Sequence, residues 1–385
     1  MKFIHLADLH LGKTVKDFSM IEDQKFMLEK IVETAEKEKI DAVLIAGDVY
    51  DRTIPPEDAV KLFDNFIFAL SEINVKVLLI SGNHDSDERL NFGSRLFVDK
   101  GIFFSTKYEG ILYKKTFNDE YGPINFYLLP FVKASQVKHY FPDEEIESYE
   151  DAVRTVISSA EINKEERNVI IAHQFVAGRG GEITLGGSEN PAVMNVGLVE
   201  QIGFSVFDDF DYAALGHIHK AQKIGRDEVR YAGAILKYHV DEVNDEKSFP
   251  IVTIKEKGKV DISLKSIKAL RDMRALRGNL KQLLSEENIT DTDDYIFVTL
   301  TDEDIVDDAM NIFRNIYPNT MQIRYDNSYT KEIEKVDFSK IKEERSFTEL
   351  ISDFYMQIYQ TEITDEEMAV MKKAAGKAGI INETD

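Results

Sequence analysis

The 385-residue sequence contains no cysteine and no tryptophan. The absence of cysteine excludes disulfide bonds, thiolate metal ligands, iron–sulfur clusters and cysteine nucleophiles. No stretch approaches the ~18 consecutive apolar residues of a membrane-spanning helix. The N-terminal residues reach Asp8 and His10 before they could form the apolar core of a secretory signal, which needs about 7–15 residues. We therefore expect a cytoplasmic protein.

Positive charge is also scarce, because 47 Lys and Arg stand against 70 Asp and Glu and give a net charge of −23. A surface of this acidity does not bind nucleic acid over its whole extent, since phosphate binding requires positive charge. The charge is unevenly distributed: residues 255–281 contain nine basic and three acidic residues, whereas 282–313 contain ten acidic residues and no basic ones. Any contact with DNA should therefore be local, weak and sensitive to salt.

The sequence does have the composition of a folded protein, with 43% hydrophobic and 10% aromatic residues. Its length indicates two or three domains at roughly 100–200 residues each. Short apolar runs at 3–7, 42–46 and 75–80 alternate with segments of helical periodicity, which predicts βαβ units with buried, largely parallel strands. In such sheets, ligands bind beyond the carboxyl ends of the strands.

Five polar clusters occur at the ends of strand-like runs. They are Asp8-Leu9-His10, Gly47-Asp48-Val49-Tyr50-Asp51, Gly82-Asn83-His84-Asp85, Ala172-His173-Gln174 and Gly216-His217-Ile218-His219. Each cluster alone is more typical of a turn, a helix cap or a structural histidine than of a ligand. Together, their carboxylates, amide and imidazoles suit Mn²⁺, Fe²⁺, Zn²⁺ or Co²⁺. The ordered set therefore predicts a dinuclear metal site.

This ordered set resembles the signature of the calcineurin-like metallophosphoesterase family. The resemblance implies an α/β fold, in which two β-sheets form a sandwich flanked by helices. It implies one cation held by Asp8, His10, Asp48 and His219, and a second held by Asp48, Asn83, His173 and His217. We expect Mn²⁺ or Mg²⁺, because two such cations hold the attacking and leaving oxygens of a phosphodiester and convert a bridging water to hydroxide.

His84 is not among the implied ligands. The resemblance implies that it faces the phosphate, where an imidazole stabilises or protonates the departing oxygen. Asp51 is expected to orient either His84 or a metal ligand.

More narrowly, the chain is similar over nearly its whole length to the SbcD family of bacterial nuclease subunits. The matching segments are 8–13, 47–52, 81–86, 172–175, 206–212 and 215–220. The sequence departs from that family at Ala234 and Ile235, which stand where the family has Ser-Pro. This departure affects a loop but removes no implied ligand.

The narrower resemblance also implies a domain organisation and a partner. We expect a nuclease domain over 1–265, a small α+β capping and DNA-binding domain over 266–335, and a C-terminal helix–loop–helix over 345–380. The implied activity is double-strand exonuclease and single-strand or hairpin endonuclease in DNA repair. The implied partner is an SMC-like ATPase of the SbcC type, in a complex of two plus two chains.

Two segments are candidates for binding DNA and this ATPase. The basic stretch carries Arg271, Arg274 and Arg277 at a spacing of three, which either contact DNA or belong to a solvated linker helix. Amphipathic helices are predicted over 346–360 and 364–377, and they either bind the ATPase or fold back on the core. The candidate partner-binding residues are Phe347, Leu350, Phe354, Tyr355 and Ile358.

The resemblance further implies a homodimer built from helices near 56–73 and 87–99. For each candidate contact, burial in the monomer core is the alternative. The candidates are Phe63, Phe66, Ile67, Phe92 and Phe97. Two other functions stay open, namely a stand-alone metallophosphatase or cyclic-nucleotide phosphodiesterase, and a non-catalytic scaffold stabilised by metal. The additional C-terminal elements favour the nuclease.

Overall fold

The computed structural model divides the chain into two compact units, Met1–Arg274 and Ala275–Asp385. The residues that it describes are 1–178, 183, 201–328, 330, 347–359 and 361–377. Among these described residues, no helix is both long enough and apolar enough to cross a membrane.

The first unit contains a six-stranded sheet in the order β16-β15-β1-β4-β5-β6. Its strands are β1 (Lys2–Leu6), β4 (Ala42–Ala46), β5 (Lys76–Ile80), β6 (Ile102–Ser105), β15 (Ser248–Ile254) and β16 (Val260–Ser266). Strands β1, β4, β5 and β6 are parallel, as the apolar runs predict. Leu6 of β1 pairs with Ile45 of β4, and Ala46 of β4 pairs with Ile80 of β5. The loops that follow β1, β4 and β5 therefore start side by side at one edge of the sheet.

A second six-stranded sheet has the order β13-β14-β12-β9-β8-β7. Its strands are β7 (Tyr113–Asp119), β8 (Gly122–Leu129), β9 (Arg167–His173), β12 (Tyr212–Gly216), β13 (Gln222–Ile224) and β14 (Arg226–Tyr231). The four central strands are parallel and the two edge strands are antiparallel. Gly216 pairs with His173, which brings the ends of β12 and β9 side by side.

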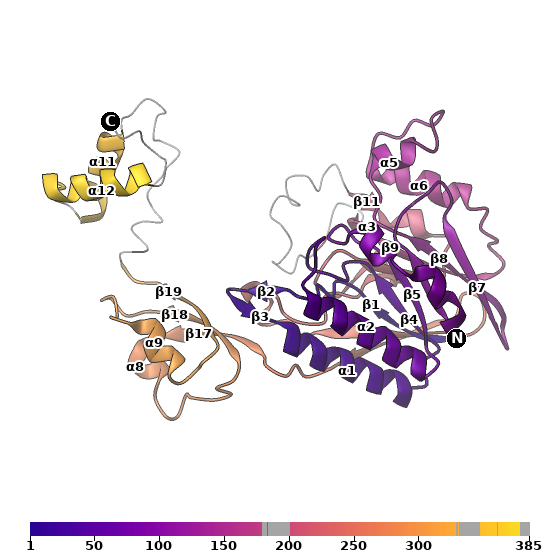
Figure 1. Cartoon of the computed structure of the whole chain (residues 1–385), viewed down its shortest axis with the longest axis horizontal. Coiled ribbons are helices and arrows are strands. Elements are labelled where there is room, and N and C mark those ends of the chain that lie inside the picture. Colours follow the sequence, from indigo (N-terminus) through magenta and orange to yellow (C-terminus); the bar gives the residue numbers. More distant parts are fainter. Residues whose placement is uncertain (179–182, 184–200, 329, 331–346, 360, 378–385) are drawn as a thin grey trace. The chain divides into compact units, whose positions relative to one another are not determined.

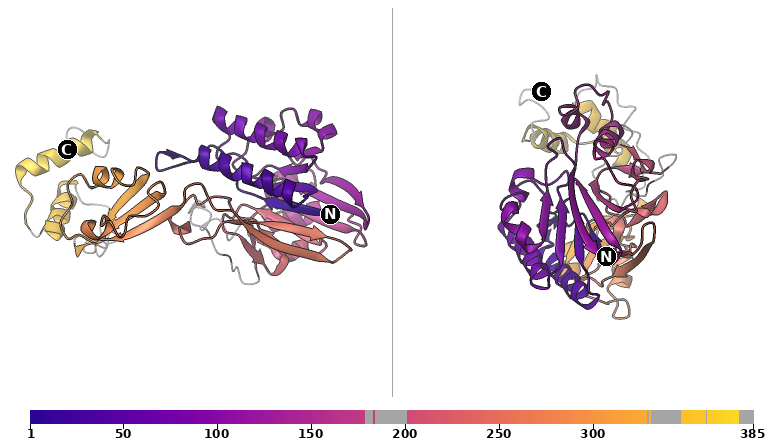
Figure 2. Two further views of the ribbon diagram at one scale, coloured as in Figure 1. Left: turned by 90° about the horizontal axis from the view of Figure 1, so that it is seen from below. Right: turned by 90° about the vertical axis from the view of Figure 1, so that its right-hand side faces the viewer.

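The two sheets pack face to face (Figure 2). Phe3 of the first sheet makes edge-on ring contacts with Phe126 and Tyr212 of the second, each with centroids 5.7 Å apart. Helices α1 (Ile21–Lys37) and α2 (Glu57–Glu72) cover the outer face of the first sheet (Figure 1). Helices α5 (Ala134–Lys138) and α6 (Tyr149–Ser159) pack on the second. The predicted α/β sandwich is confirmed.

Local sequence explains where these helices form. Glu57 and Asp58 occupy the first turn of α2, where negative charge favours the helix N-terminus. In α6, Ser148 and Asp151 form a reciprocal capping box. Shorter elements complete the first unit: β2 (Thr14–Val15), β3 (Phe18–Ser19), α3 (Asp87–Leu90), α4 (Ser94–Phe97), η1 (Val98–Lys100), β10 (Val176–Ala177), β11 (Ile202–Gly203), η2 (Phe204–Phe207) and η3 (Val240–Glu242).

The second unit contains a three-stranded sheet in the order β17-β18-β19. Its elements are β17 (Met273–Gly278), α8 (Leu280–Leu283), β18 (Tyr295–Leu300), α9 (Ala309–Arg314) and β19 (Thr320–Tyr325). Strand β18, helix α9 and strand β19 follow one another as a strand–helix–strand unit. Helix α9 does not extend N-terminally beyond Ala309, because the preceding Asp308 has a left-handed φ of 55°, which interrupts the helical backbone.

Strand β17 overturns the interpretation of the basic stretch as a linker helix. A spacing of three fits one face of a helix, but on a strand it places Arg274 and Arg277 on opposite faces. Residues 273–278 form a strand because they pair with β18 in the sheet. In a short segment of mixed polar and apolar residues, such tertiary contacts outweigh the local sequence pattern.

Helices α11 (Phe347–Tyr359) and α12 (Asp365–Lys377) confirm the two predicted C-terminal helices. The Tyr355 hydroxyl donates to the Glu367 carboxylate at 2.6 Å and joins the two helices. Glu367 also caps α12 by accepting from the backbone N–H of Thr364 at 2.9 Å. Four of the five candidate partner-binding side chains are half-buried, and the side chain of Ile358 lies outside the described residues.

Candidate metal centre

Both sheets contribute loops to one polar centre. The five polar clusters end or follow β1, β4 and β5 in the first sheet, and β9 and β12 in the second. The sheets are joined there by His173, whose Nδ1 donates to the carbonyl of Ala46 at 2.7 Å. Five of the seven candidate ligands are buried, namely Asp8, His10, Asp48, His173 and His219. Burial of so many ionisable groups requires that they be paired or hold a cation.

The loops approach each other closely because two glycines leave room. A Cβ at Gly82 would overlap the carboxylate of Asp48, and one at Gly216 would overlap the Ala46 carbonyl and the His173 ring. Asp8 and Asp48 have left-handed φ angles of 52° and 50°. Such backbone costs of order 1–3 kcal/mol per residue and concentrates at functional sites, where the surrounding structure enforces it.

We expect Gly82→Ala to weaken Mn²⁺ binding by at least about tenfold, because the added methyl group displaces the Asp48 carboxylate. Gly203→Ala is a matched control, because its methyl group would meet the movable carboxylate of Glu150 at 3.3 Å. Calorimetric titration with Mn²⁺ measures the difference, and circular dichroism checks the fold. Equal affinity of Gly82→Ala and the wild type would contradict this account of the site.

One group of candidate ligands consists of Asp8, His10 and His219, whose ligand atoms lie within 4.8 Å of one another. The Nε2 atoms of His10 and His219 are 3.0 Å apart. Burial and the neighbouring His219 hold the pKa of His10 well below its usual value, and burial and Lys247 do the same for His219. Both rings are therefore neutral, and their converging nitrogens suit a shared cation.

A second group consists of Asp8, Asp48 and His173, again with ligand atoms within 4.8 Å. His173 Nε2 is 3.4 Å from Asp48 Oδ2 and 3.1 Å from Asn83 Oδ1. The same Asn83 oxygen lies 3.0 Å from His217 Nδ1. Because His173 donates through Nδ1, its Nε2 is the atom turned toward this group, as in metal-binding histidines oriented by a carbonyl.

Asp48 belongs to the second group and also lies close to His10 of the first. Its Oδ2 is 3.7 Å from His10 Nε2 on one side and 3.4 Å from His173 Nε2 on the other. Burial acts to raise the pKa of Asp48, but His173 and His10 outweigh burial and hold it well below its usual value. The carboxylate is therefore ionised. With carboxylate, amide and imidazole donors on both sides of it, this centre fits two divalent cations.

The ionisation of His173 gives a testable pH dependence. Burial acts to lower its pKa, but the Asp48 carboxylate outweighs burial and raises it to about 9. A cation at Nε2 needs the neutral ring, so His173 must lose a proton on binding, whereas His10 and His219 are already neutral. We expect about one proton to be released near neutral pH, and Mn²⁺ affinity to rise with pH up to about pH 9.

Calorimetry in buffers of different ionisation enthalpy measures this proton release. Binding without proton release, or an affinity that falls as pH rises from 6 to 8, would contradict a ligand role for His173.

His84 lies at the exposed side of the centre. Its ring stands edge-on to His10, with centroids 4.9 Å apart, and its Nδ1 donates to the backbone carbonyl of Asp51 at 2.9 Å. Its backbone N–H donates to Asp48 Oδ1 at 2.9 Å. The carboxylate of Asp51 instead accepts from Lys13 Nζ at 2.7 Å and lies 3.6 Å from His10 Nδ1. Asp51 thus contacts His84 through its backbone carbonyl and lies close to His10, one of the candidate ligands, through its carboxylate.

Asp85 has a structural part in the centre that the sequence did not indicate. Its carboxylate accepts from the backbone N–H groups of Val49, Tyr50 and Gly82 at 2.9–3.1 Å. These bonds tie the loop after β4 to the loop after β5. Burial and the Asp48 carboxylate raise the pKa of Asp85 to about 6. The only sequence feature that could have indicated this role is the position of Asp85 at the end of the Gly82-Asn83-His84-Asp85 cluster.

The three candidate DNA-binding arginines have different surroundings. Arg271 forms ion pairs with Glu22 at 2.8 Å and with Asp23 at 3.1 Å in the first unit. Arg277 pairs with Asp326 in the second unit, and Arg274 is half-buried.

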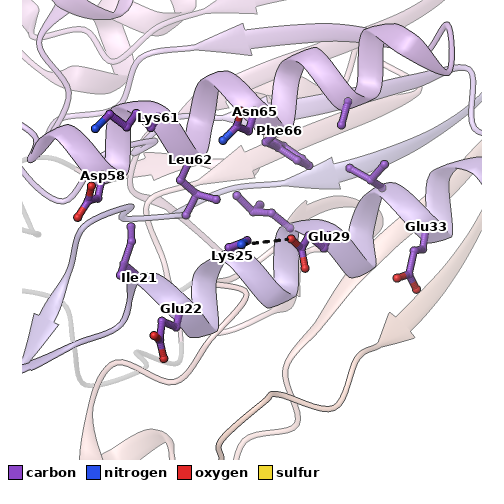
Figure 3. A pocket seen from close by; sticks show the side chains of 13 residues that line it. Ile21, Glu22, Lys25, Glu29, Glu33, Asp58, Lys61, Leu62, Asn65 and Phe66 are labelled. Carbon is purple, nitrogen blue, oxygen red and sulfur yellow. Dashed lines mark ion pairs between the residues drawn. The ribbon is translucent and has the colours of Figure 1, made fainter.

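A groove of about 640 Å³ lies between α1 and α2, outside the metal centre (Figure 3). Leu28, Leu62 and Phe66 line it, and the ion pair between Lys25 and Glu29 stands at its rim. None of the candidate ligands contributes to this groove.

Two sequence profiles of known protein families match this chain. The sequence profile of calcineurin-like phosphoesterases matches residues 1–221, and that of the Type 5 capsule protein repressor C-terminal domain (SbcD_C) matches residues 269–359. Together they support the predicted resemblance to SbcD-type nucleases.

Two solved structures are similar to this chain. A dimetal phosphatase from Danio rerio is 14% identical with a TM-score of 0.41, over 70% of this chain and 98% of its own. A protein of Thermus thermophilus is 10% identical with a TM-score of 0.39, over 68% and 98%. Since the first profile spans more than half of the sequence, this chain belongs to the calcineurin-like phosphoesterase family, whose members are metal-dependent hydrolases.

Proposed function

We propose that this chain is the nuclease subunit of a DNA-processing complex. It would cleave double-stranded ends as an exonuclease and single strands or hairpins as an endonuclease. The observation that carries the proposal is the position of the Asp48 carboxylate between His10 of the first ligand group and His173 of the second, with the imidazole of His84 exposed beside it. The SbcD_C match over 269–359 supports the nuclease over a general phosphatase.

Seven side chains would hold the two cations, for which the family resemblance implies Mn²⁺ and which the mixed oxygen and nitrogen donors suit. Asp8, His10, Asp48 and His219 would form one site, and Asp48, Asn83, His173 and His217 the other. When bound, the cations supply positive charge to the phosphodiester and make hydroxide available near neutral pH.

The other residues of the centre, His84, Asp51 and Lys13, orient side chains or transfer protons. Because His84 donates through Nδ1 to the Asp51 carbonyl, its Nε2 is the nitrogen that can face the substrate. In the protonated ring, Nε2 donates to the departing oxygen, which is general-acid work suited to imidazole. Lys13 pairs with the Asp51 carboxylate beside His10, so this carboxylate would repel a substrate phosphate less.

The exposed position of His84 argues against a purely structural metal site, because a structural site needs no imidazole at its open side. A stand-alone phosphatase or cyclic-nucleotide phosphodiesterase would use the same centre. The SbcD_C match and the amphipathic helices α11 and α12 favour the nuclease and its SbcC-type ATPase partner. Binding of DNA by Arg271, Arg274 and Arg277, the two-plus-two assembly and the cytoplasmic location stay predictions.

Cleavage of labelled DNA tests the proposal. The full chain, with and without its ATPase partner, is incubated with Mn²⁺ and duplex or hairpin DNA, with bis-p-nitrophenyl phosphate and p-nitrophenyl phosphate in parallel. We expect DNA cleavage that EDTA abolishes. Hydrolysis of the small esters without any DNA cleavage, in both the absence and presence of the partner, would favour the stand-alone phosphatase.

The proposed homodimer would use exposed apolar side chains on α2 and near α3 and α4. Phe63, Phe66 and Ile67 are buried in the monomer, whereas Phe92 is 87% exposed and Leu96 is 80% exposed. We expect the double change Phe92→Ser, Leu96→Ser to convert a dimer to a monomer in light scattering, because it removes the apolar surface that association would bury. Ile111→Ser, at another exposed apolar residue, should leave the dimer intact. A double variant that remains dimeric would contradict this interface.

A further inference from the structure

Two buried side chains outside the ligand set support the loop that carries His10. Gln24 of α1 is fully buried, and its Nε2 lies 2.8 Å from the carbonyl of His10 and 3.3 Å from that of Leu9. Its Oε1 accepts from the backbone N–H of Gly12 at 3.0 Å. One amide therefore holds the loop from both sides of His10.

The second supporting side chain is Tyr238, which is distant in sequence but in direct contact with Gln24. Its hydroxyl donates to the Leu9 carbonyl at 2.7 Å and lies 3.0 Å from Gln24 Nε2. Its ring packs edge-on against His10 and less closely against His219, with centroids 6.0 and 6.3 Å away. Tyr238 therefore contacts both imidazoles whose Nε2 atoms converge.

The residues that precede these two supports are both ion-paired with one short segment. Asp23 pairs with Arg271 at 3.1 Å, and Lys237 pairs with Asp272 at 2.8 Å. Arg271 also donates to Glu22 at 2.8 Å. This segment lies just before Ala275, with Met273 and Arg274 between them, and the second unit begins at Ala275. Two consecutive residues of the connection are thus fixed to the neighbours of Gln24 and of Tyr238.

We propose that Gln24 and Tyr238 are positioning residues for His10 and His219, and that Arg271 and Asp272 couple them to the segment that leads into the second unit. Asp23 is fully buried, so separating its carboxylate from the Arg271 guanidinium is energetically costly. Displacement of the segment therefore either breaks this pair or moves the start of α1, and with it Gln24. The proposal deepens the proposed function, because it assumes that His10 and His219 bind a cation.

Such coupling acts in both directions. A cation held by His10 and His219 stabilises the supported loop and thereby the paired segment. Conversely, a force that draws the segment away from α1 weakens cation binding at that site. A partner bound to the second unit could in this way regulate hydrolysis without touching the metal centre.

Mn²⁺ titration of the full chain tests the coupling. The variants are Tyr238→Phe, Asp272→Asn and the double change Asp23→Asn, Arg271→Gln, which removes the buried ion pair and leaves only the exposed carboxylate of Glu22 without this arginine. Lys30→Ala is the matched control, because it removes another α1 ion pair, to Glu33 at 2.8 Å. We expect about tenfold weaker binding of one Mn²⁺ in the three variants, with the second Mn²⁺ and the control unaffected.

Two further readouts separate positioning from loss of structure. Turnover of bis-p-nitrophenyl phosphate should recover in the variants at high Mn²⁺, and thermal unfolding in EDTA checks the fold. Tyr238→Phe and Asp272→Asn should also combine non-additively, because they act on one support. If the double variant does not fold, the Mn²⁺ affinity of the milder Asp272→Asn variant tests the coupling.

If the wild type binds two Mn²⁺ and the three variants bind them with the same affinity, the proposed coupling is overturned, but the proposed function is not. The same result with weakened, less salt-dependent DNA binding in the Arg271 variant would instead assign Arg271 to DNA. A wild type that binds no Mn²⁺ would overturn both this inference and the proposed function.

Discussion

Replacing Asp48 with asparagine is expected to reduce Mn²⁺-dependent phosphodiester hydrolysis by more than about a hundredfold, since residues that merely support metal ligands already contribute about 10- to 100-fold. The Asp48 carboxylate lies between His10, a member of one ligand group, and His173, a member of the other. Asparagine keeps an oxygen that accepts from the backbone N–H of His84, but it removes the negative charge between the two groups. The initial rate with bis-p-nitrophenyl phosphate, at fixed Mn²⁺, measures the loss.

The matched control is Asp64→Asn, which makes the same change at an exposed position of α2. It should leave the rate unchanged. A wild-type rate in Asp48→Asn would remove Asp48 from the metal centre and with it the arrangement of two cations around one carboxylate.

Replacing His84 with alanine should separate turnover from metal binding. We expect about 10²- to 10⁴-fold slower hydrolysis, which is the usual contribution of a general acid. Mn²⁺ should bind as in the wild type, because His84 contacts Asp48 through its backbone N–H, which alanine retains. Single-turnover kinetics and a parallel Mn²⁺ titration measure the two quantities.

His139→Ala, which removes another exposed histidine, is the control and should be fully active. If His84→Ala lost a bound Mn²⁺ as well as activity, His84 would be a ligand rather than the group that assists the departing oxygen.

The sequence was sufficient to predict the loops of the centre within the first sheet. Short apolar runs ending in polar clusters mark buried parallel strands, and parallel strands bring their carboxyl ends to one edge. Asp8, Asp48 and Asn83 therefore had to lie near each other once β1, β4 and β5 were adjacent. Their ordered spacing also carried the resemblance to the phosphoesterase family, which the profile match confirms.

Contacts between the two sheets could not be predicted from the pattern of strands and polar clusters. The hydrogen bond from His173 to Ala46 depends on how two sheets pack, and no local pattern encodes it. The same limit applies to Gln24 and Tyr238, which meet across 214 residues of sequence. A buried glutamine and a buried tyrosine are each typical of ordinary core packing, so neither indicated a function.

Local periodicity was ambiguous at two further places. Arginines at a spacing of three fit a helix, but β17 pairs in a sheet and places them on a strand. On α2, helical spacing predicted an apolar stripe but could not decide which side it faced. The first sheet buries Phe63 and Phe66, whereas Phe68, on the other side of the helix, is 61% exposed.

Counting the divalent cations bound to the purified chain tests the central claim most directly. After removal of metal by chelation, calorimetric titration with Mn²⁺ should give two bound ions per chain, and Asp48→Asn should weaken both. A wild-type chain that binds one Mn²⁺ or none under these conditions would contradict a dinuclear centre built around Asp48.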